Sequence, residues 1–199
     1  MPLPLRALLL SALLGTVLAP QVARAQPAVA RTQVTPPAAT AFATRLPSVD
    51  GFEYVAEVTP LLLRGSQPDS VGVAWLKRRG VKTVINLRRT HGDSEQARVE
   101  AAGMRYVHIP LAASEPPEPG QIAAFLRLLR DPSAGPVFVH CAQGVDRTGT
   151  MLAIYRMEVE RWSNLQAYDE MMSFGAHRVW RDLRRFVRRY QRGQLGHPS

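Results

Sequence analysis

The only cysteine of the chain stands in the segment VHCAQGVDRTGT, residues 139–150, six positions before an arginine. A short apolar run precedes the segment and a helical pattern follows it, so the intervening turn can direct several backbone N–H groups to one point at a helix start. Such a turn suits an anion with tetrahedral oxygens, and it favours the thiolate form of Cys141. The planar fork of Arg147 can hold two phosphate oxygens at once. The predicted chemistry is that of a thiolate nucleophile beside a bound phosphate.

Other residues of this segment fit the same chemistry. Gly144 allows the backbone to curl closely, and the Thr148 hydroxyl is placed to stabilise the thiolate. His140 is predicted to orient the loop through hydrogen bonds rather than to act as a base, because a thiolate already formed needs none. The backbone groups predicted to bind substrate oxygens are those of Ala142, Gln143, Gly144 and Val145.

Strands and helices alternate along the rest of the domain, and they position the cysteine segment. Apolar runs predict strands at residues 52–58, 61–64, 81–87, 104–109 and 136–139. Amphipathic patterns predict helices at residues 70–80, 94–103, 122–130 and 148–161. This alternation predicts an α/β fold, with a central, mostly parallel sheet flanked by helices on both faces. Ligand sites of such sheets lie at the carboxyl ends of the strands, where Cys141 is expected.

The order His-Cys, five residues, Arg-Thr-Gly resembles the signature of the cysteine-dependent protein tyrosine phosphatase superfamily, in particular small bacterial dual-specificity-type members. The segments LLRGSQP at residues 62–68, GVKTVINLR at 80–88 and VHIPL at 107–111 extend the likeness to about residues 53–175. The resemblance implies the dual-specificity-phosphatase fold and two-step phosphoryl transfer through a phosphocysteine. It implies neither a metal nor an organic cofactor.

The expected function is therefore hydrolysis of phosphomonoesters, with phosphotyrosine or dual-specificity protein phosphatase activity. The expected partner is a phosphorylated protein, a phosphorylated small molecule or a lipid headgroup. Two alternatives stay open: a phosphoinositide or inositol-polyphosphate phosphatase of the same fold, and a non-catalytic phosphate-binding module. Retention of both Cys141 and Arg147 favours catalysis, because binding alone needs no nucleophile.

The general acid is the open part of this mechanism. Many relatives place an aspartate on the loop before the signature strand, but here the loop PLAASEPPEPG offers only Glu115 and Glu118. Asp146 lies inside the signature, as in myotubularin-type lipid phosphatases, and is the preferred candidate. Its alternative role is to brace the loop by hydrogen bonding. Asp131, at a predicted helix end beside Pro132, is assigned a capping or turn role.

Three residues outside the signature also have expected roles. Arg88 ends a strand on the predicted site side and is expected to attract substrate phosphate. Arg64 is expected to be a buried, hydrogen-bonding arginine near Gln67, and His177 to cap or pack the terminal helix.

The sequence before and after this core indicates compartment and surface charge. Residues 1–25 have the charged, apolar and small-residue parts of a cleavable signal peptide, so a periplasmic or secreted location is expected. Residues 26–47 are predicted to be a Pro/Ala-rich disordered linker, and residues 48–199 the phosphatase domain. The formal net charge is +9, concentrated in a basic, amphipathic C-terminal helix with a weak attraction to anionic membranes. A nucleic-acid partner is not expected, and the chain is expected to be a monomer.

Overall fold

The computed structural model describes residues 41–90 and 93–193, which form an α/β domain around one six-stranded sheet. The predicted signal peptide and most of the predicted linker lie outside these residues. The strand order is β1-β2-β3-β6-β4-β5. β1 pairs with β2 and β2 with β3 in antiparallel fashion, whereas β3, β6, β4 and β5 pair in parallel. The strands are β1 (Thr44–Arg45), β2 (Val55–Thr59), β3 (Leu62–Gly65), β4 (Thr83–Asn86), β5 (Arg105–His108) and β6 (Val137–His140).

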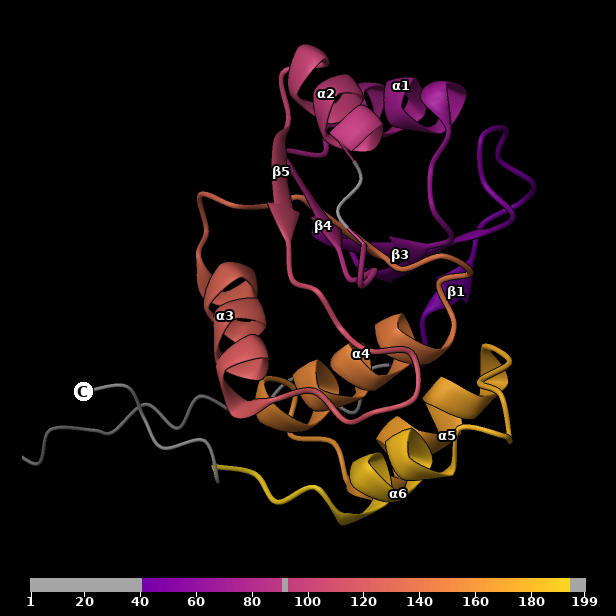
Figure 1. Ribbon diagram of the computed structural model, residues 1–199, viewed down its shortest axis with the longest axis vertical. Coiled ribbons are helices and arrows are strands. Elements are labelled where there is room, and N and C mark those ends of the chain that lie inside the picture. The colour runs from indigo at the N-terminus through magenta and orange to yellow at the C-terminus, as the bar shows by residue number, and fades with distance from the viewer. Residues whose placement is uncertain (1–40, 91–92, 194–199) are drawn as a thin grey trace, which may run out of the picture. The chain divides into compact units, whose positions relative to one another are not determined.

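Helices cover both faces of this sheet, as predicted. In Figure 1, α1 and α2 lie on one side of the strands, and α3, α4, α5 and α6 lie on the other. The helices are α1 (Ser70–Arg78), α2 (Asp93–Ala101), α3 (Pro119–Arg130), α4 (Asp146–Glu158), α5 (Asn164–Ser173) and α6 (Arg181–Arg189). None of the helices in the described ranges is long and apolar enough to cross a membrane.

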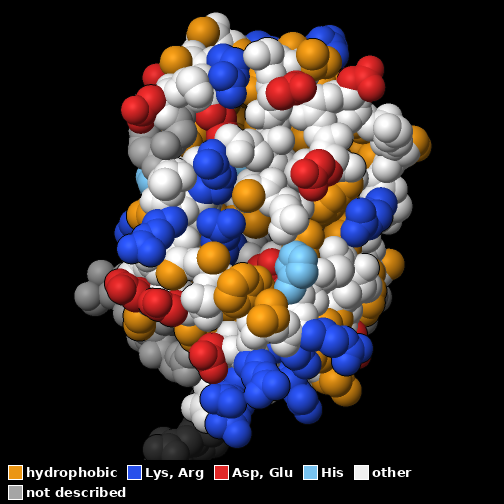
Figure 2. All heavy atoms as spheres, turned by 45° about the vertical axis from the view of Figure 1, so that its right-hand side comes forward, with side chains coloured by type: hydrophobic (Ala, Val, Ile, Leu, Met, Phe, Trp, Pro, Cys, Tyr) orange, Lys and Arg blue, Asp and Glu red, His pale blue; other side chains and the backbone are white. Residues whose placement is uncertain are grey.

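The predicted amphipathic C-terminal helix is confirmed as α6. Its buried residues are Leu183 and Val187, while most of its arginines are exposed. Lys and Arg side chains gather at the lower end of the view in Figure 2, where α6 lies in Figure 1. Five of these arginines line a surface hollow of about 550 Å³ among the described residues: Arg181, Arg184, Arg185, Arg188 and Arg189.

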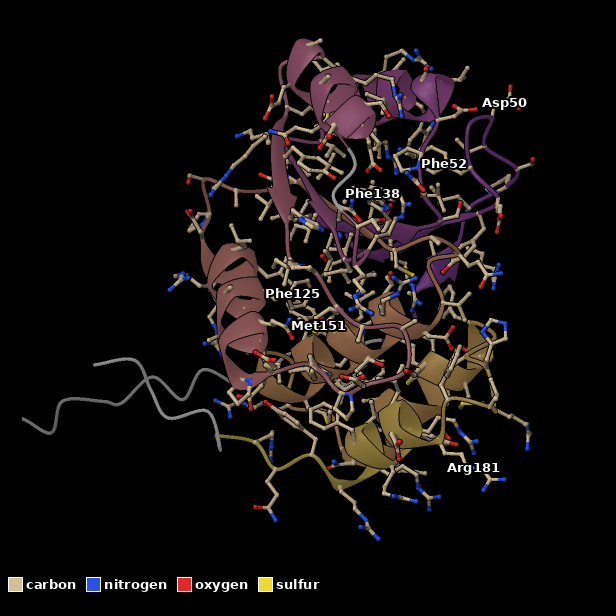
Figure 3. The ribbon with its side chains drawn as sticks, viewed as in Figure 1. Asp50, Phe52, Phe125, Phe138, Met151 and Arg181 are labelled. Atoms are coloured by element: carbon tan, nitrogen blue, oxygen red, sulfur yellow. The ribbon has the colours of Figure 1, made fainter. Side chains whose placement is uncertain are left out.

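The two faces of the sheet carry two separate hydrophobic clusters. Phe138 of β6 packs with Val73 and Leu76 of α1 on one face. Phe125 of α3 and Met151 of α4 belong to the larger cluster on the other face, and Figure 3 shows them on the side away from Phe52 and Phe138. All four residues of β6 are buried, because this strand lies between β3 and β4 and is covered on both faces. The sheet therefore holds the end of β6, and hence Cys141, rigidly.

Two elements differ from the predicted set. The helix α5 is absent from the predicted elements, although a capping box of Ser163 and Gln166 marks its start. The strand β1 falls within the predicted linker: it pairs with β2, and the backbone N–H of Ala43 donates to Glu170 Oε1 at 2.7 Å. Ordered structure thus begins before the predicted domain boundary at Ser48. A strand of only two exposed residues contains no alternation of apolar and polar positions, so the sequence pattern could not indicate it.

Candidate active site

Cys141 lies at the carboxyl end of β6, where the chain turns into α4 through residues 141–147, here called the cysteine loop. The thiol side chain is buried and is not in a disulfide. Gly144 has a φ of +72°, and a Cβ at this position would lie 2.1 Å from the carbonyl oxygen of Gly65. Only glycine fits both the left-handed backbone and this close approach to β3. The predicted role of Gly144 in curling the loop is consistent with this geometry.

The carbonyl oxygen of Gly144 accepts hydrogen bonds from Arg64 of β3 and from Tyr54, the residue before β2. Arg64 Nη2 donates to it at 2.9 Å, and the Tyr54 hydroxyl donates at 2.5 Å. Arg64 is fully buried, with its guanidinium carbon 3.9 Å from the centroid of the Phe174 ring. Burial lowers the pKa of Arg64, although the nearby Tyr54 and Glu170 oppose that shift. The expectation of a buried, hydrogen-bonding Arg64 is confirmed, and its acceptor is the cysteine loop itself.

A buried carboxylate, Glu95 of α2, lies behind the cysteine loop. His140 Nε2 is 2.7 Å from Glu95 Oε1, and His140 Nδ1 is 2.9 Å from the carbonyl oxygen of Cys141. Each ring nitrogen of His140 therefore lies next to an oxygen atom, one from α2 and one from the cysteine loop. Gln67 Nε2 donates to Glu95 Oε2 at 2.6 Å, while the Gln67 N–H donates to the Ala142 carbonyl at 2.9 Å. Through these bonds, β3 and α2 fix the start of the loop.

The environment of Glu95 sets its charge. Burial alone would raise the pKa of Glu95, but the hydrogen bond and charge of His140 outweigh it, helped by Gln67 and Arg88, and the pKa is lowered. Glu95 is thus an ionised carboxylate in the interior. Sequence reasoning missed this residue because it lies 46 positions before Cys141, on a helix whose pattern gave no sign that one carboxylate turns inward.

Asp146 is the first residue of α4 and is bound by His177, from the segment between α5 and α6. The backbone N–H of His177 donates to Asp146 Oδ1 at 2.8 Å, and His177 Nδ1 lies 2.7 Å from Asp146 Oδ2. His177 was expected to cap or pack the terminal helix. Its side chain instead contacts Asp146 of the cysteine loop, which lies 31 residues earlier in the chain.

The remaining predicted residues of the loop are in place. Arg147 is half-buried and forms no ion pair with a described residue, so its guanidinium is available to a substrate anion. Ala142 and Gln143 are exposed and Val145 is half-buried. Thr148 is fully buried, and its hydroxyl has no hydrogen-bond partner within the described residues, Cys141 included. Stabilisation of the thiolate by Thr148 therefore stays a prediction.

The structure gives Arg88 a protein partner. Arg88 Nη1 lies 4.0 Å from Glu95 Oε2, and Nη2 donates to Thr90 Oγ1 at 3.3 Å. With a side chain 27% exposed, Arg88 borders the buried carboxylate, and contact with substrate stays a prediction.

The acidic candidates outside the loop lie on the surface. Glu115 is exposed on the loop before α3, and Glu118 is exposed at the N-cap position of α3. Asp131 follows α3 and accepts hydrogen bonds from the Ser133 N–H at 2.9 Å and the Ser133 hydroxyl at 2.7 Å, which is the turn form of its expected capping or turn role. The described parts of the chain contain no group of three or more His, Cys, Asp or Glu residues that could hold a metal ion.

A buried thiol and an arginine lie on one turn that connects the central strand β6 to α4. This arrangement, within this α/β fold, defines the class of cysteine-dependent phosphatases of the dual-specificity type. A family model described as "DSP-PTPase phosphatase fused to NAD+ Kinase" matches residues 47–187. The chain belongs to this family.

Named relatives agree with that assignment. The dual specificity protein phosphatases TpbA from two strains of Pseudomonas aeruginosa are both 32% identical to the chain, over 71% and 76% of its length. These alignments cover 64% and 71% of the two relatives, so the first is matched over just under two thirds of its length.

Solved structures give the same result. A crystal structure of P. aeruginosa TpbA is 29% identical with a TM-score of 0.65, covering 78% of this chain and 94% of that one. A cysteine-to-serine variant of TpbA in complex with phosphotyrosine has the same TM-score at 31% identity, covering 78% and 93%. The catalytic core of Siw14 shares the fold at 18% identity and a TM-score of 0.57, over 65% and 80%.

Proposed function

We propose that the protein is an exported, cysteine-dependent phosphatase that hydrolyses phosphomonoesters, phosphotyrosine among them, through a phosphocysteine intermediate. The observation that carries the proposal is the pairing of buried Cys141 with Arg147 across one loop at the helix start of α4. The TpbA complex with phosphotyrosine supports a phosphorylated substrate. Export rests on the signal-peptide pattern of residues 1–25, and it predicts a mature protein shortened at its N-terminus.

In the first step, the Cys141 thiolate attacks phosphorus in line, so that an S–P bond forms as the bond to the leaving oxygen breaks. Arg147 and the loop N–H groups stabilise the equatorial oxygens as charge shifts. An acid protonates the leaving oxygen. Water then hydrolyses the phosphocysteine and regenerates the thiolate.

A second candidate, a phosphoinositide or inositol-polyphosphate phosphatase, is favoured by the arginine surface of α6. His177, which contacts the cysteine loop, is followed directly by Arg178 and then by α6. Positive charge thus begins beside the site, where it can attract substrates that carry more than one phosphate.

The test is hydrolysis of p-nitrophenyl phosphate under reductant by the wild type, Cys141→Ser and Arg147→Lys. We expect no turnover by Cys141→Ser and a loss of at least about 100-fold for Arg147→Lys, because a lysine cannot hold two equatorial oxygens in the planar geometry of arginine. Equal rates for wild type and Cys141→Ser would refute the enzyme and leave the phosphate-binding module. A panel of phosphotyrosine peptide, phosphoserine peptide and phosphoinositide then separates the two candidates.

A further inference from the structure

The contact between His177 and Asp146 engages one ring nitrogen of the histidine and leaves the other ring nitrogen unbonded to any described residue. Asp146 Oδ1 accepts from the backbone N–H of His177 at 2.8 Å, and Asp146 Oδ2 lies 2.7 Å from His177 Nδ1. The Asp146 side chain is 12% exposed, whereas the His177 side chain is 46% exposed. The second ring nitrogen, Nε2, has no hydrogen bond to any described residue. The histidine is therefore anchored at the loop and presents a nitrogen to solvent beside it.

This geometry assigns different roles to the two residues. A carboxylate that accepts from Nδ1–H fixes the ring and its tautomer, and it stabilises the imidazolium that can release a proton from Nε2. Asp146 itself accepts at both oxygens, one of them from a backbone N–H that cannot change roles. Both carboxylate oxygens of Asp146 are thus directed at His177. Asp146 is thereby suited to positioning, and His177 to proton transfer.

The competing carboxyl groups lack comparable support. Glu115 is exposed, and no described residue holds its carboxyl in a hydrogen bond or ion pair. Glu118 occupies the N-cap of α3, and its backbone N–H is tied to Gln121 Oε1 at 2.7 Å. Neither is bound to the cysteine loop by a hydrogen bond, as His177 is through Asp146.

We propose that His177 is the proton donor of the reaction and that Asp146 positions it, an inference that rests on the phosphatase function proposed above. In the first step, Nε2–H gives its proton to the leaving oxygen while the O–P bond breaks and the S–P bond to Cys141 forms. In the second step, water attacks phosphorus, the S–P bond breaks, and the proton of that water passes to Nε2. Atoms and charge balance over the cycle without a further reactant.

Leaving-group dependence tests this role. His177→Gln keeps the backbone bond to Asp146 but has no proton to transfer, so kcat should fall about 100-fold or more on phenyl phosphate, whose leaving group is poor. The loss on p-nitrophenyl phosphate, whose leaving group is good, should be much smaller. Asp146→Asn should show the same selectivity, and the double variant should lose little more than either single one. Val179→Ala, at an exposed neighbouring position, is the matched control and should match the wild type on both substrates.

Several outcomes would overturn the inference. Equal losses on both substrates would make His177 a brace of the loop only, and a selective loss in Asp146→Asn alone would make Asp146 the acid. Selective loss in Glu115→Gln or Glu118→Gln, with His177→Gln unaffected, would move the acid to the preceding loop. Unchanged inhibition by orthovanadate shows that a variant retains its folded loop, and His177→Asn replaces His177→Gln if the latter fails that check. Failure of the proposed function is distinct, since the wild type would then match Cys141→Ser on both substrates.

Discussion

At the scale of single residues, a buried carboxylate supports the cysteine loop through a histidine. Glu95 is 1% exposed and binds His140, whose other nitrogen reaches the Cys141 carbonyl. Removing one partner from a buried polar pair leaves the other unsatisfied, which costs more than the pair contributes. Glu95 is therefore expected to matter for stability although it lies behind the reacting atoms.

Glu95→Gln should lower the free energy of unfolding by about 1–3 kcal/mol at pH 7. The pKa of Glu95 is lowered in the folded state, so its ionised form contributes stability above the unfolded pKa of roughly 4.3. That contribution is lost as the pH falls through the lower folded pKa. The gap between wild type and variant should narrow on acidification below about pH 4, as measured by urea unfolding at several pH values.

The matched control is Glu100→Gln, an exposed position on the same helix. It should change stability by less than about 0.5 kcal/mol at every pH. A gap that stays constant from pH 7 to pH 3.5 would contradict an ionised Glu95.

Sequence reasoning recovered the residues of the site that lie next to each other in the chain. One turn contains Cys141, Gly144 and Arg147, and the types and spacing of these residues indicate phosphate binding and a thiolate nucleophile. Glu95 and His177 reach the loop from separate segments, α2 and the α5–α6 connection. A glutamate on a polar helix and a histidine in a loop look like surface residues until the fold brings them to the loop.

At the scale of elements, the N-terminal segment around β1 is anchored to α5 and its C-cap. Glu170 of α5 accepts from the Ala43 N–H and pairs with buried Arg156 of α4 at 2.6 Å. Arg45 of β1 lies over the rings of Tyr54 and Phe174, 4.4 and 5.1 Å from their centroids. Tyr54 in turn donates to Gly144, so β1 also supports the cysteine loop indirectly.

A chain that begins at Ser48 should therefore be less stable than one that begins at Ala41. The loss of a hydrogen bond to a charged group and of the Arg45 contacts should cost about 2–4 kcal/mol in urea unfolding. The chain from Ala41 should match the full-length protein. Equal stability of the two shortened chains would show that β1 contributes nothing and that the predicted boundary at Ser48 is adequate.

The main elements were predictable because their patterns are local. Thr83, Val84 and Ile85 are β-branched and fully buried in β4. Asp69 caps α1 by accepting from the N–H groups of Val71 and Gly72. The start of α4 was predicted two residues late, at Thr148 instead of Asp146. A glycine-containing loop gives no local sign of where helical geometry begins.

At the scale of the whole molecule, charge is unevenly distributed. Residues 178–193 contain seven arginines and one aspartate, so this short segment holds six of the nine net positive charges. Arg184 donates to the Tyr168 hydroxyl, whereas Arg185 forms an exposed ion pair with Asp182 at 3.5 Å. The apolar side of α6 is buried, so this surface can attract a membrane by charge but not by insertion.

We expect the protein to bind phosphatidylglycerol vesicles and not phosphatidylcholine vesicles in sedimentation, with binding weakened at least about tenfold by 0.5 M salt. Replacing four exposed arginines of α6 by glutamine should abolish this binding, and these are Arg181, Arg185, Arg188 and Arg189. The matched control replaces four exposed cations elsewhere and should bind as the wild type does: Arg78, Lys82, Arg105 and Arg127. Equal losses in both sets would indicate that net charge alone, and not α6, attracts the vesicles.

The position of β6 has a consequence for how the protein folds. This strand is the last of the six that the structure describes, yet it lies between β3 and β4, which do not pair with each other. Until residues 137–140 are synthesised, the two halves of the sheet have no common neighbour. Contacts that close over such long sequence separations slow folding. Sheet closure therefore comes late, and the strand that completes it is the one that delivers the nucleophile.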